Sequence, residues 1–458
     1  LMASTYIKRD LSVSETIYKW TWSAWVKRSG SFNTVNTLFK SRQDGNNWVQ
    51  VYFGDGGHAD ELLVASYKNG GYHYTYSTSK KFKDVNAWYH IVVNVDSSQS
   101  TAGDRVRIYV NGERETSFAN STNNLSNGDS LIFNTSDSGT GHTIGSWNAG
   151  SYFDGSMSHV HYSSGYSYAP TVFGSTDSTT GEWKINTAPS FTLGGNGYTV
   201  LKDGNTITDQ SSNSNDFTVG GGTLTKTEDN PSNVFCTMNP LMNYSNGTPT
   251  FSHGNNKVDG SGTAWMRTVG TLGNRTGKFY YEAYIETYNS NHYKPQRLGW
   301  DSIDFPRAGS ENYYSGFNIS TDGYIRGGIK GYGNYDPNAE ALGTTLAQGD
   351  YLGFAIDLDN DLISIYKNGT VISNVNNYDI SSKTNCSIKK SYGYQVSPSM
   401  NFYSQNAGDN KCDFNFGNGA FGSTQLTGTT YQDSNGQGVF KYQPPTNYLA
   451  WCTKNFNV

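Results

Sequence analysis

Apolar and polar residues alternate along many short stretches of the chain. From residue 20 to residue 27, Trp20, Trp22, Ala24 and Val26 take every second position. A period of two with one apolar set is typical of a β-strand that buries one face of a sheet. The same rule predicts strands at 37–40, 48–53, 61–67, 88–96, 106–110 and 155–162, and later at 279–286, 297–300, 324–328, 351–358, 362–366 and 414–416.

Glycine-containing pairs separate several of these predicted strands. Asn-Gly and Asp-Gly favour the two-residue turns of β-hairpins, because Asn, Asp and Gly tolerate a positive φ. No long segment shows the 3.6-residue apolar period of an amphipathic helix. The pairs are Asp44-Gly45, Asn69-Gly70, Asn111-Gly112 and Asn368-Gly369.

The alternating pattern weakens in the middle of the chain. Stretches 174–181 and 220–233 are rich in Gly, Ser, Thr and Asp, a composition typical of loops. We therefore expect a first domain over 1–175, a connecting segment over 176–232 and a second domain over 233–458. A chain of 458 residues has room for two or three domains of ordinary size.

One short motif occurs in both halves. Ile-Tyr-x-Asn-Gly stands at 108–112 and again at 365–369, each time after an alternating stretch that ends in Asp. One interpretation is a tandem of two sandwiches with the same architecture. The other is that any hairpin favours Asn-Gly. The sequence leaves both open.

Composition narrows the fold class. Aromatic residues make up 14% of the chain, too many for a protein without a buried core. Ala, Leu, Glu and Lys are too scarce for a helical bundle or a coiled coil. The 52 glycines and 34 tyrosines fit many strands joined by turns. We predict an all-β protein made of two tandem antiparallel β-sandwiches.

Charge and hydropathy exclude two kinds of partner. The net charge of -5 and the pI near 5.9 argue against a nucleic-acid binder, whose footprint is a basic face. The chain contains no run of about 18 apolar residues, so we expect no insertion into a membrane.

The two halves resemble two known domain families. The first half resembles a laminin-G-like, concanavalin-A-like sandwich at 22–27, 88–93, 108–112 and 153–160, where Phe153-Asp154-Gly155 precedes His159-Val160. The second half resembles a SPRY domain in five short matches that follow the family's order. These matches are at 277–282, 298–300, 349–354, 363–369 and 415–417.

The tandem as a whole resembles structural proteins of marine tailed phages. In that group a segment like 196–217 bridges two such domains, and endings like 442–453 recur. The resemblance, and not the composition, implies a virion component on the outer surface of the particle, such as a tail fibre, tail tip or capsid appendage. It implies other virion proteins, further copies of the chain in a homo-oligomer, and a host-surface glycan or receptor as partners.

A search for catalytic groups finds no convincing set. Glucanases with a concanavalin-A-like fold need two carboxylates that flank the scissile bond. Glu282 and Glu286 are the nearest pair, but four residues of strand separate them by about 13 Å, which is too far. His159 and His161 share one strand face without a carboxylate at a suggestive spacing, so a packed or solvated pair is the preferred interpretation. We predict that the protein is not an enzyme and needs no cofactor.

Calcium stays an open alternative. Laminin-G-like relatives often hold a calcium ion with loop carboxylates, and Asp44, Asp55 and Asp154 are turn aspartates here. However, Asp-Gly is also ordinary turn chemistry. No ligand set is predicted.

Aromatic residues in the predicted loops are the best candidates for binding. Tyrosine offers a large flat surface with a polar tip at a low entropic cost, and it is enriched in recognition surfaces. The alternative is that these tyrosines pack on neighbouring strands. The candidate ligand-binding residues are Tyr72, Tyr74, Trp147 and Tyr152 in the first half and Tyr313, Tyr314, Tyr332 and Tyr335 in the second.

The leading hypothesis is therefore a non-enzymatic virion protein that binds a host-surface glycan or protein. A purely structural decoration or assembly subunit is the first alternative, and a glycan-cleaving enzyme is the second. Because SPRY domains bring their ends together, the resemblance also implies that Cys236 and Cys452 are neighbours in space.

Overall fold

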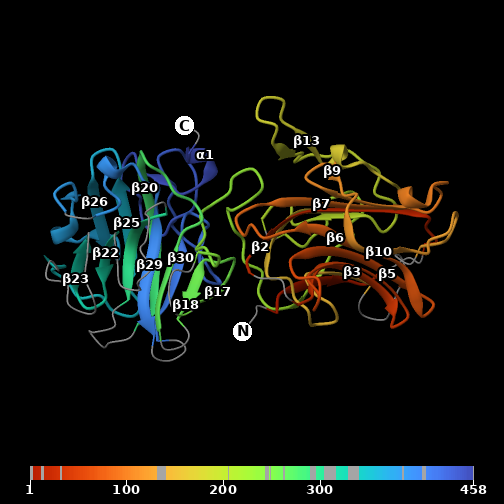
Figure 1. The fold of residues 1–458 in the computed structure, drawn as a ribbon, viewed down its shortest axis with the longest axis horizontal. Coiled ribbons are helices and arrows are strands. Elements are labelled where there is room, and N and C mark those ends of the chain that lie inside the picture. The colour runs from red at the N-terminus through yellow and green to blue at the C-terminus, as the bar shows by residue number, and fades with distance from the viewer. Residues whose placement is uncertain are drawn as a thin grey trace. The chain divides into compact units, whose positions relative to one another are not determined.

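The computed structural model divides the chain into two compact units, Leu1–Leu224 and Thr225–Val458, which are described separately here (Figure 1). The described residues are 4–11, 15–30, 34–131, 141–204, 206–242, 247, 249–260, 264–288, 296–303, 316–327, 340–383, 386–404 and 409–456.

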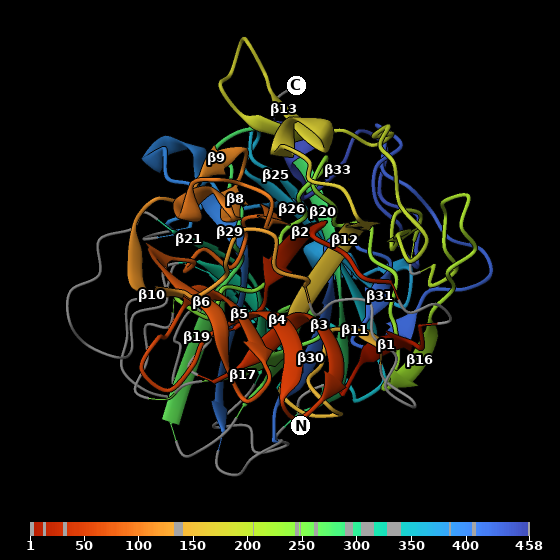
Figure 2. The same ribbon diagram turned by 90° about the vertical axis from the view of Figure 1, so that its right-hand side faces the viewer.

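The first unit contains two large antiparallel sheets. The eight-stranded sheet has the order β10 (Phe118–Asn123), β6 (Gly71–Lys81), β5 (Glu61–Lys68), β4 (Asn47–Phe53), β3 (Asn36–Asp44), β11 (His142–Ile144), β1 (Tyr6–Arg9) and β16 (Thr218–Gly221). Figure 2 shows these strands side by side in this order. The six-stranded sheet has the order β15 (Tyr198–Val200), β12 (Gly155–Ser164), β2 (Lys19–Arg28), β7 (Tyr89–Asp96), β8 (Val106–Val110) and β9 (Glu113–Arg114).

The core of the first unit lies between the inner faces of these sheets. The predicted alternation of β2 is confirmed, because Trp20, Trp22, Ala24 and Val26 all belong to one buried cluster. Residues 49, 51 and 53 of β4 join the same cluster. Residues 48, 50 and 52 must therefore point to the opposite, outer face of the eight-stranded sheet.

The second unit is also built from antiparallel sheets. One has the order β17 (Thr250–Ser252), β18 (Lys257–Asp259), β30 (Lys411–Asn415), β20 (Lys278–Thr287), β25 (Tyr351–Asp357), β26 (Leu362–Lys367) and β27 (Thr370–Val371), with β28 (Tyr378–Asp379) beside β26 and β33 (Leu449–Ala450) beside β20. The other has the order β19 (Ala264–Val269), β29 (Val396–Ser404), β21 (Arg297–Ser302), β22 (Phe317–Ser320), β23 (Tyr324–Gly327) and β24 (Glu340–Ala341).

A buried aromatic cluster fills the second unit. Tyr281 stacks on Phe354 with ring centroids 4.7 Å apart and meets Trp300 edge-on at 5.8 Å. Among the described residues, the α-helical structure is confined to α1 (Thr453–Phe456). The predicted all-β fold of two antiparallel sandwiches is confirmed.

The structure does not show a simple connecting segment over 176–232, because parts of this stretch form strands of the first unit. Strand β15 extends the six-stranded sheet beside β12, β16 pairs with β1, and β13 (Gly174–Thr176) pairs with β14 (Trp183–Ile185). The division falls after Leu224, so most of the segment belongs to the first unit. Strands of three or four residues within stretches rich in Gly and Ser are too short to show a readable period.

The repeated motif forms the same turn twice. Asn111 and Asn368 have φ of 49° and 50°, and the glycines that follow them both have φ of 83°. The side-chain oxygens of the two asparagines accept hydrogen bonds from the backbone N–H groups of His90 and Tyr351, both at 2.8 Å. Strands β7, β8 and β9 thus match β25, β26 and β27, and the two sandwiches share this three-strand arrangement.

The two ends of the second unit meet, as expected. Phe235 forms an isolated antiparallel bridge with Cys452, and the Cys236 N–H donates to the Trp451 carbonyl oxygen at 2.8 Å. All four cysteines are buried free thiols, so no disulfide joins these ends.

Candidate functional site

A row of aromatic side chains crosses the outer face of the eight-stranded sheet. Trp48 on β4 lies directly opposite Arg42 on β3 and Tyr67 on β5. Tyr67 in turn lies opposite Tyr72 on β6. Because directly opposed residues of antiparallel strands share one face, four neighbouring strands present these side chains together.

The rings of this row touch one another. Trp48 stacks on Tyr67 with centroids 5.5 Å apart, and Tyr67 meets Tyr72 edge-on at 5.2 Å. Trp147 reaches the same place from the loop after β11 and meets Trp48 edge-on at 5.2 Å. We call Trp48, Tyr67, Tyr72 and Trp147 the aromatic row. Tyr72 is 54% exposed, and the other three are partly exposed.

A tight turn presents Trp147. Trp147 and Gly150 exchange two backbone hydrogen bonds of 2.8 and 2.9 Å, which leaves Asn148 and Ala149 as a two-residue turn. Both turn residues have positive φ, 47° and 56°, as a type I′ turn requires. A left-handed conformation costs an alanine about 1–2 kcal/mol. Such strain is often found at functional positions.

Lys40 on β3 supports this turn from below. Its Nζ donates to Asn148 Oδ1 at 2.7 Å and lies 5.4 Å from the centre of the Trp147 ring. The Lys40 side chain is fully buried. A buried ammonium group needs such partners, and it places a fixed positive charge beneath the aromatic row.

The structure brings together three of the predicted binding residues. Tyr72 and Trp147 belong to the aromatic row. Tyr152 lies beside them, and its hydroxyl donates to the Ala149 carbonyl oxygen of the turn at 2.6 Å. Tyr313, Tyr314, Tyr332 and Tyr335 lie outside the described residues.

The prediction for Tyr74 was wrong. Tyr74 is 1% exposed and belongs to the core of the first unit. Regular alternation would place Tyr72 and Tyr74 on the same face. However, the register between β5 and β6 shifts between Ser66 and Tyr67, and this bulge turns Tyr72 outward and Tyr74 inward.

Four residues of this face were missed in the prediction from sequence, namely Trp48, Tyr67, Arg42 and Lys40. A signal for Tyr67 was present, because a two-residue turn at Asn69-Gly70 places Tyr67 opposite Tyr72. No local pattern indicates that Trp147 contacts Trp48, because the two are far apart in the sequence and only the fold brings them together.

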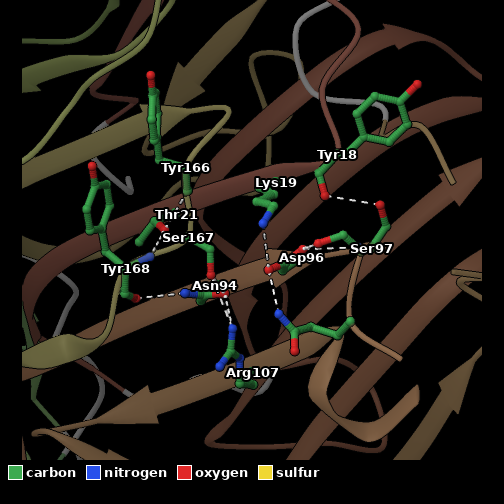
Figure 3. A network of polar contacts seen from close by, with 12 residues as sticks. Tyr18, Lys19, Thr21, Asn94, Asp96, Ser97, Arg107, Tyr166, Ser167 and Tyr168 are labelled. Carbon is green, nitrogen blue, oxygen red and sulfur yellow. Dashed lines mark hydrogen bonds and ion pairs between the residues drawn. The ribbon is translucent and has the colours of Figure 1, made fainter. Parts of the chain in front are cut away.

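Residues 166–168 cover part of the outer face of the six-stranded sheet. Figure 3 shows the polar network that pins residues 166–168 to this face. Asn94 Nδ2 donates to the Tyr168 carbonyl oxygen at 2.7 Å, and Thr21 Oγ1 donates to the Tyr166 carbonyl oxygen at 3.1 Å. Arg107 Nη2 donates to Ser167 Oγ at 3.1 Å. These polar groups anchor a loop, so we assign them a structural role.

Two buried histidines pack against aromatic residues that follow this segment in the chain. His90 lies between the rings of Trp25 and Trp183, at 4.9 and 5.9 Å. Burial lowers the pKa of His90 to about 3. His161 stacks on Phe173 at 5.4 Å, and burial holds its pKa well below the usual range.

His159 and His161, which we expected to be a packed or solvated pair, have ring centroids 6.3 Å apart. A bulge in the β12–β2 pairing lies between Ser158 and His161, and His159 has a φ of 50°. Within the described part of the chain, no group of three or more His, Cys, Asp or Glu side chains could hold a metal ion.

Two of the turn aspartates accept hydrogen bonds from backbone N–H groups of their own turns. Asp44 Oδ1 accepts a hydrogen bond from the Asn46 N–H at 2.7 Å, and Asp55 Oδ1 accepts one from the Gly56 N–H at 2.7 Å. Burial raises the pKa of the third, Asp154.

Glu282 is a buried anchor of the second unit. Its carboxylate accepts hydrogen bonds from the N–H groups of Lys441 and Tyr442, at 2.9 and 2.8 Å, and from Asn415 Nδ2 at 2.9 Å. Burial raises its pKa to about 7. The carboxylate thus holds the segment after Phe440 against β20.

A known family matches most of the first unit. Residues 3–172 match the family described as the concanavalin A-like lectin/glucanases superfamily, which agrees with the predicted laminin-G-like sandwich. No curated protein matches the chain. Among the described residues, no helix has the length and apolar character needed to cross a membrane.

Several solved structures are similar in fold. The SPRY domain of human HERC1 is 15% identical, with 42% of this chain and 99% of that one covered and a TM-score of 0.28. A candidate carbohydrate-binding protein from Bacteroides ovatus is 20% identical, with 48% and 57% covered and a TM-score of 0.31. A heptameric pentraxin from Limulus polyphemus is 16% identical, with 34% and 69% covered and a TM-score of 0.24.

Proposed function

We propose that the protein is a non-enzymatic glycan-binding protein whose first unit binds sugars on the aromatic row. The observation that carries this proposal is the contact of Trp48 with Tyr67 and Trp147 on a partly exposed sheet face. The lectin-like family match of the first unit supports it.

The chemistry of the row suits a sugar ring. Aromatic side chains offer a flat apolar surface, and tyrosine hydroxyls add polar tips at its edge. The sheet and the turn fix the rings before a ligand arrives, so little conformational entropy is lost on binding. The row is open and broad, which favours an extended polysaccharide over a small enclosed ligand.

The proposed setting is the outer surface of a phage particle. It rests on the sequence resemblance to structural proteins of marine tailed phages. A single open site of this kind binds with a Kd of about 1 mM, near -4 kcal/mol. Several copies in a homo-oligomer would raise the effective binding by about 10²–10⁴-fold, which is why surface attachment needs repeated subunits.

A glycan array with the purified protein and the Trp48→Ala variant tests the binding. We expect the wild type to bind and the variant to bind at least about tenfold more weakly, equivalent to about 1.4 kcal/mol. Tyr18→Ala is the matched control, because Tyr18 is 47% exposed but precedes β2 in the other sheet. Circular dichroism should show that both variants keep the β-sheet spectrum.

Two outcomes would contradict the proposal. If no glycan binds and purified particles contain the chain, it is a purely structural subunit of the virion. If the purified protein shortens a polysaccharide that it binds, it is an enzyme. Mass spectrometry of purified particles checks the virion setting independently of the glycan array.

A further inference from the structure

A hollow adjoins the aromatic row on the same face of the sheet. Its volume is about 360 Å³, and it lies between β1, β3, β11 and the turn that presents Trp147. None of the side chains that line it is acidic. The lining residues are Tyr6, Arg42, Thr143, Asn148 and Ala149.

Hydrogen-bond donors stand among the mainly apolar surface of this lining. An ammonium group can only donate, so the side-chain oxygen of Asn148 must face Lys40. The Nδ2 group of Asn148 is therefore turned away from Lys40. Thr143 is 2% exposed, and within the described part of the chain its Oγ1 has no hydrogen-bond partner. A buried hydroxyl without a partner is costly.

The hollow also carries positive charge in a protein whose net charge is -5. Arg42 lines it, and its Nε donates to the Asp44 carbonyl oxygen at 3.1 Å. The carboxylate of Asp44 accepts hydrogen bonds from Asn46 and Asn47, and its interaction with Arg42 is a longer-range attraction that helps to lower the Asp44 pKa. Lys8 lies opposite Thr143 on β1 and adds a further positive charge on this face.

We propose that the hollow binds the carboxylate or sulfate group of an anionic sugar whose ring stacks on the aromatic row. Arg42 offers a planar set of donors that suits both anions, and the side-chain amide of Asn148 adds a neutral donor. This inference rests on the proposed glycan binding and adds the class of sugar.

Matched pairs of oligosaccharides test the inference by isothermal titration with the full chain. One pair is oligogalacturonate and its methyl ester, which differ in the carboxylate charge. The other pair is dextran sulfate and dextran, which differ in the sulfate. We expect wild-type protein to bind at least one anionic member about tenfold more tightly than its neutral partner, the effect of one charge-assisted hydrogen bond.

Two variants distinguish the contribution of the hollow to binding from that of the aromatic row. Arg42→Gln should remove this tenfold preference, whereas Trp48→Ala should weaken the binding of both the anionic and the neutral sugar. Arg114→Gln is the control for general attraction of polyanions, because Arg114 is an exposed cation of the same unit on β9. The preference of the Arg114→Gln variant for the anionic sugar should stay at the wild-type value.

Each result supports or overturns a distinct claim. Equal affinity for the neutral and anionic members, or an unchanged preference in Arg42→Gln, overturns the anionic class while glycan binding stands. A loss of preference in Arg114→Gln as large as in Arg42→Gln also overturns it, because the attraction is then general. Failure of all four sugars to bind, together with a blank glycan array, overturns both proposals.

Discussion

Acidification should act on the two units in opposite directions, because their buried titratable groups differ. In the first unit, burial lowers the pKa of His90 from 6.5 to about 3 and that of His159 to about 4. A folded state with lowered histidine pKa values binds fewer protons than the unfolded chain between about pH 3 and 6.5. The stability of the first unit therefore falls as the pH falls below 6.5.

For each group, the free energy of unfolding changes by about 1.36 kcal/mol for every pH unit between its folded and unfolded pKa values. At pH 5, about 1.5 units below the ordinary pKa, His90 lowers the free energy of unfolding of the first unit by about 2 kcal/mol. His159 is only half-buried, so solvent screening reduces its share to about 1 kcal/mol. The first unit should therefore lose at least about 3 kcal/mol between pH 7.5 and pH 5, because burial also lowers the pKa values of His161 and His73. Asp154, whose pKa burial raises, offsets part of this loss.

The second unit should gain stability over the same interval. Burial raises the pKa of Glu282 from 4.5 to about 7 and that of Asp413 from 3.8 to about 6. Here the folded state binds more protons than the unfolded chain, so acidification stabilises it. Between pH 7.5 and pH 5 the gain is about 2 kcal/mol for Glu282 and about 1 kcal/mol for Asp413. His253, whose pKa burial lowers, offsets part of this gain.

Urea unfolding at pH 7.5 and pH 5 can follow each unit by its own probe. All four cysteines are buried in the second unit, so their reaction with dithiodipyridine, which attacks thiols at acidic pH, reports its unfolding. Tryptophan fluorescence mainly reports the first unit, which holds Trp20, Trp22, Trp25, Trp48, Trp88, Trp147 and Trp183 of the ten. With a slope of about 3 kcal/mol per M, each midpoint should shift by about 1 M, in opposite directions.

Two variants serve as controls for this prediction. His159→Asn removes one titrating group, and asparagine tolerates the positive φ at this position, so the acid sensitivity of the first unit should fall. Glu282→Gln should flatten the pH response of the second unit. Midpoints that shift in the same direction in both units, or variants with unchanged pH responses, would show that these buried groups do not control the pH dependence of stability.

The remaining predictions concern stability at the aromatic row. Ala149→Gly should stabilise the first unit by about 1 kcal/mol, because glycine relieves the left-handed strain at φ 56°, and a lower melting temperature would contradict the strained turn. Tyr74→Ala should destabilise the first unit by about 3–5 kcal/mol, as truncation of a core aromatic does. Tyr72→Ala should change the stability by no more than about 0.5 kcal/mol, since Tyr72 is 54% exposed. Equal effects of the two tyrosine variants in urea titrations would show that the bulge between them is misplaced.

The strands and turns were largely predictable, because alternation and Asn-Gly pairs are local signals. Trp20 and Trp22 face the core as their spacing indicates. Tyr74 was misplaced because one extra residue in a bulge reverses the faces, and no composition rule locates that residue. Lys40 resembles an ordinary surface lysine in the sequence, and only a turn from a distant segment buries it.

Hydroxyl-radical footprinting of the protein with a bound oligosaccharide tests whether the sugar binds on the aromatic row, because it reports the exposure of each aromatic side chain. We expect Trp48, Tyr67, Tyr72 and Trp147 to become protected from oxidation. The exposed tyrosines Tyr18, Tyr166, Tyr324 and Tyr392 should oxidise at the same rate with and without the sugar. Protection of these four with an unprotected aromatic row would contradict this expectation.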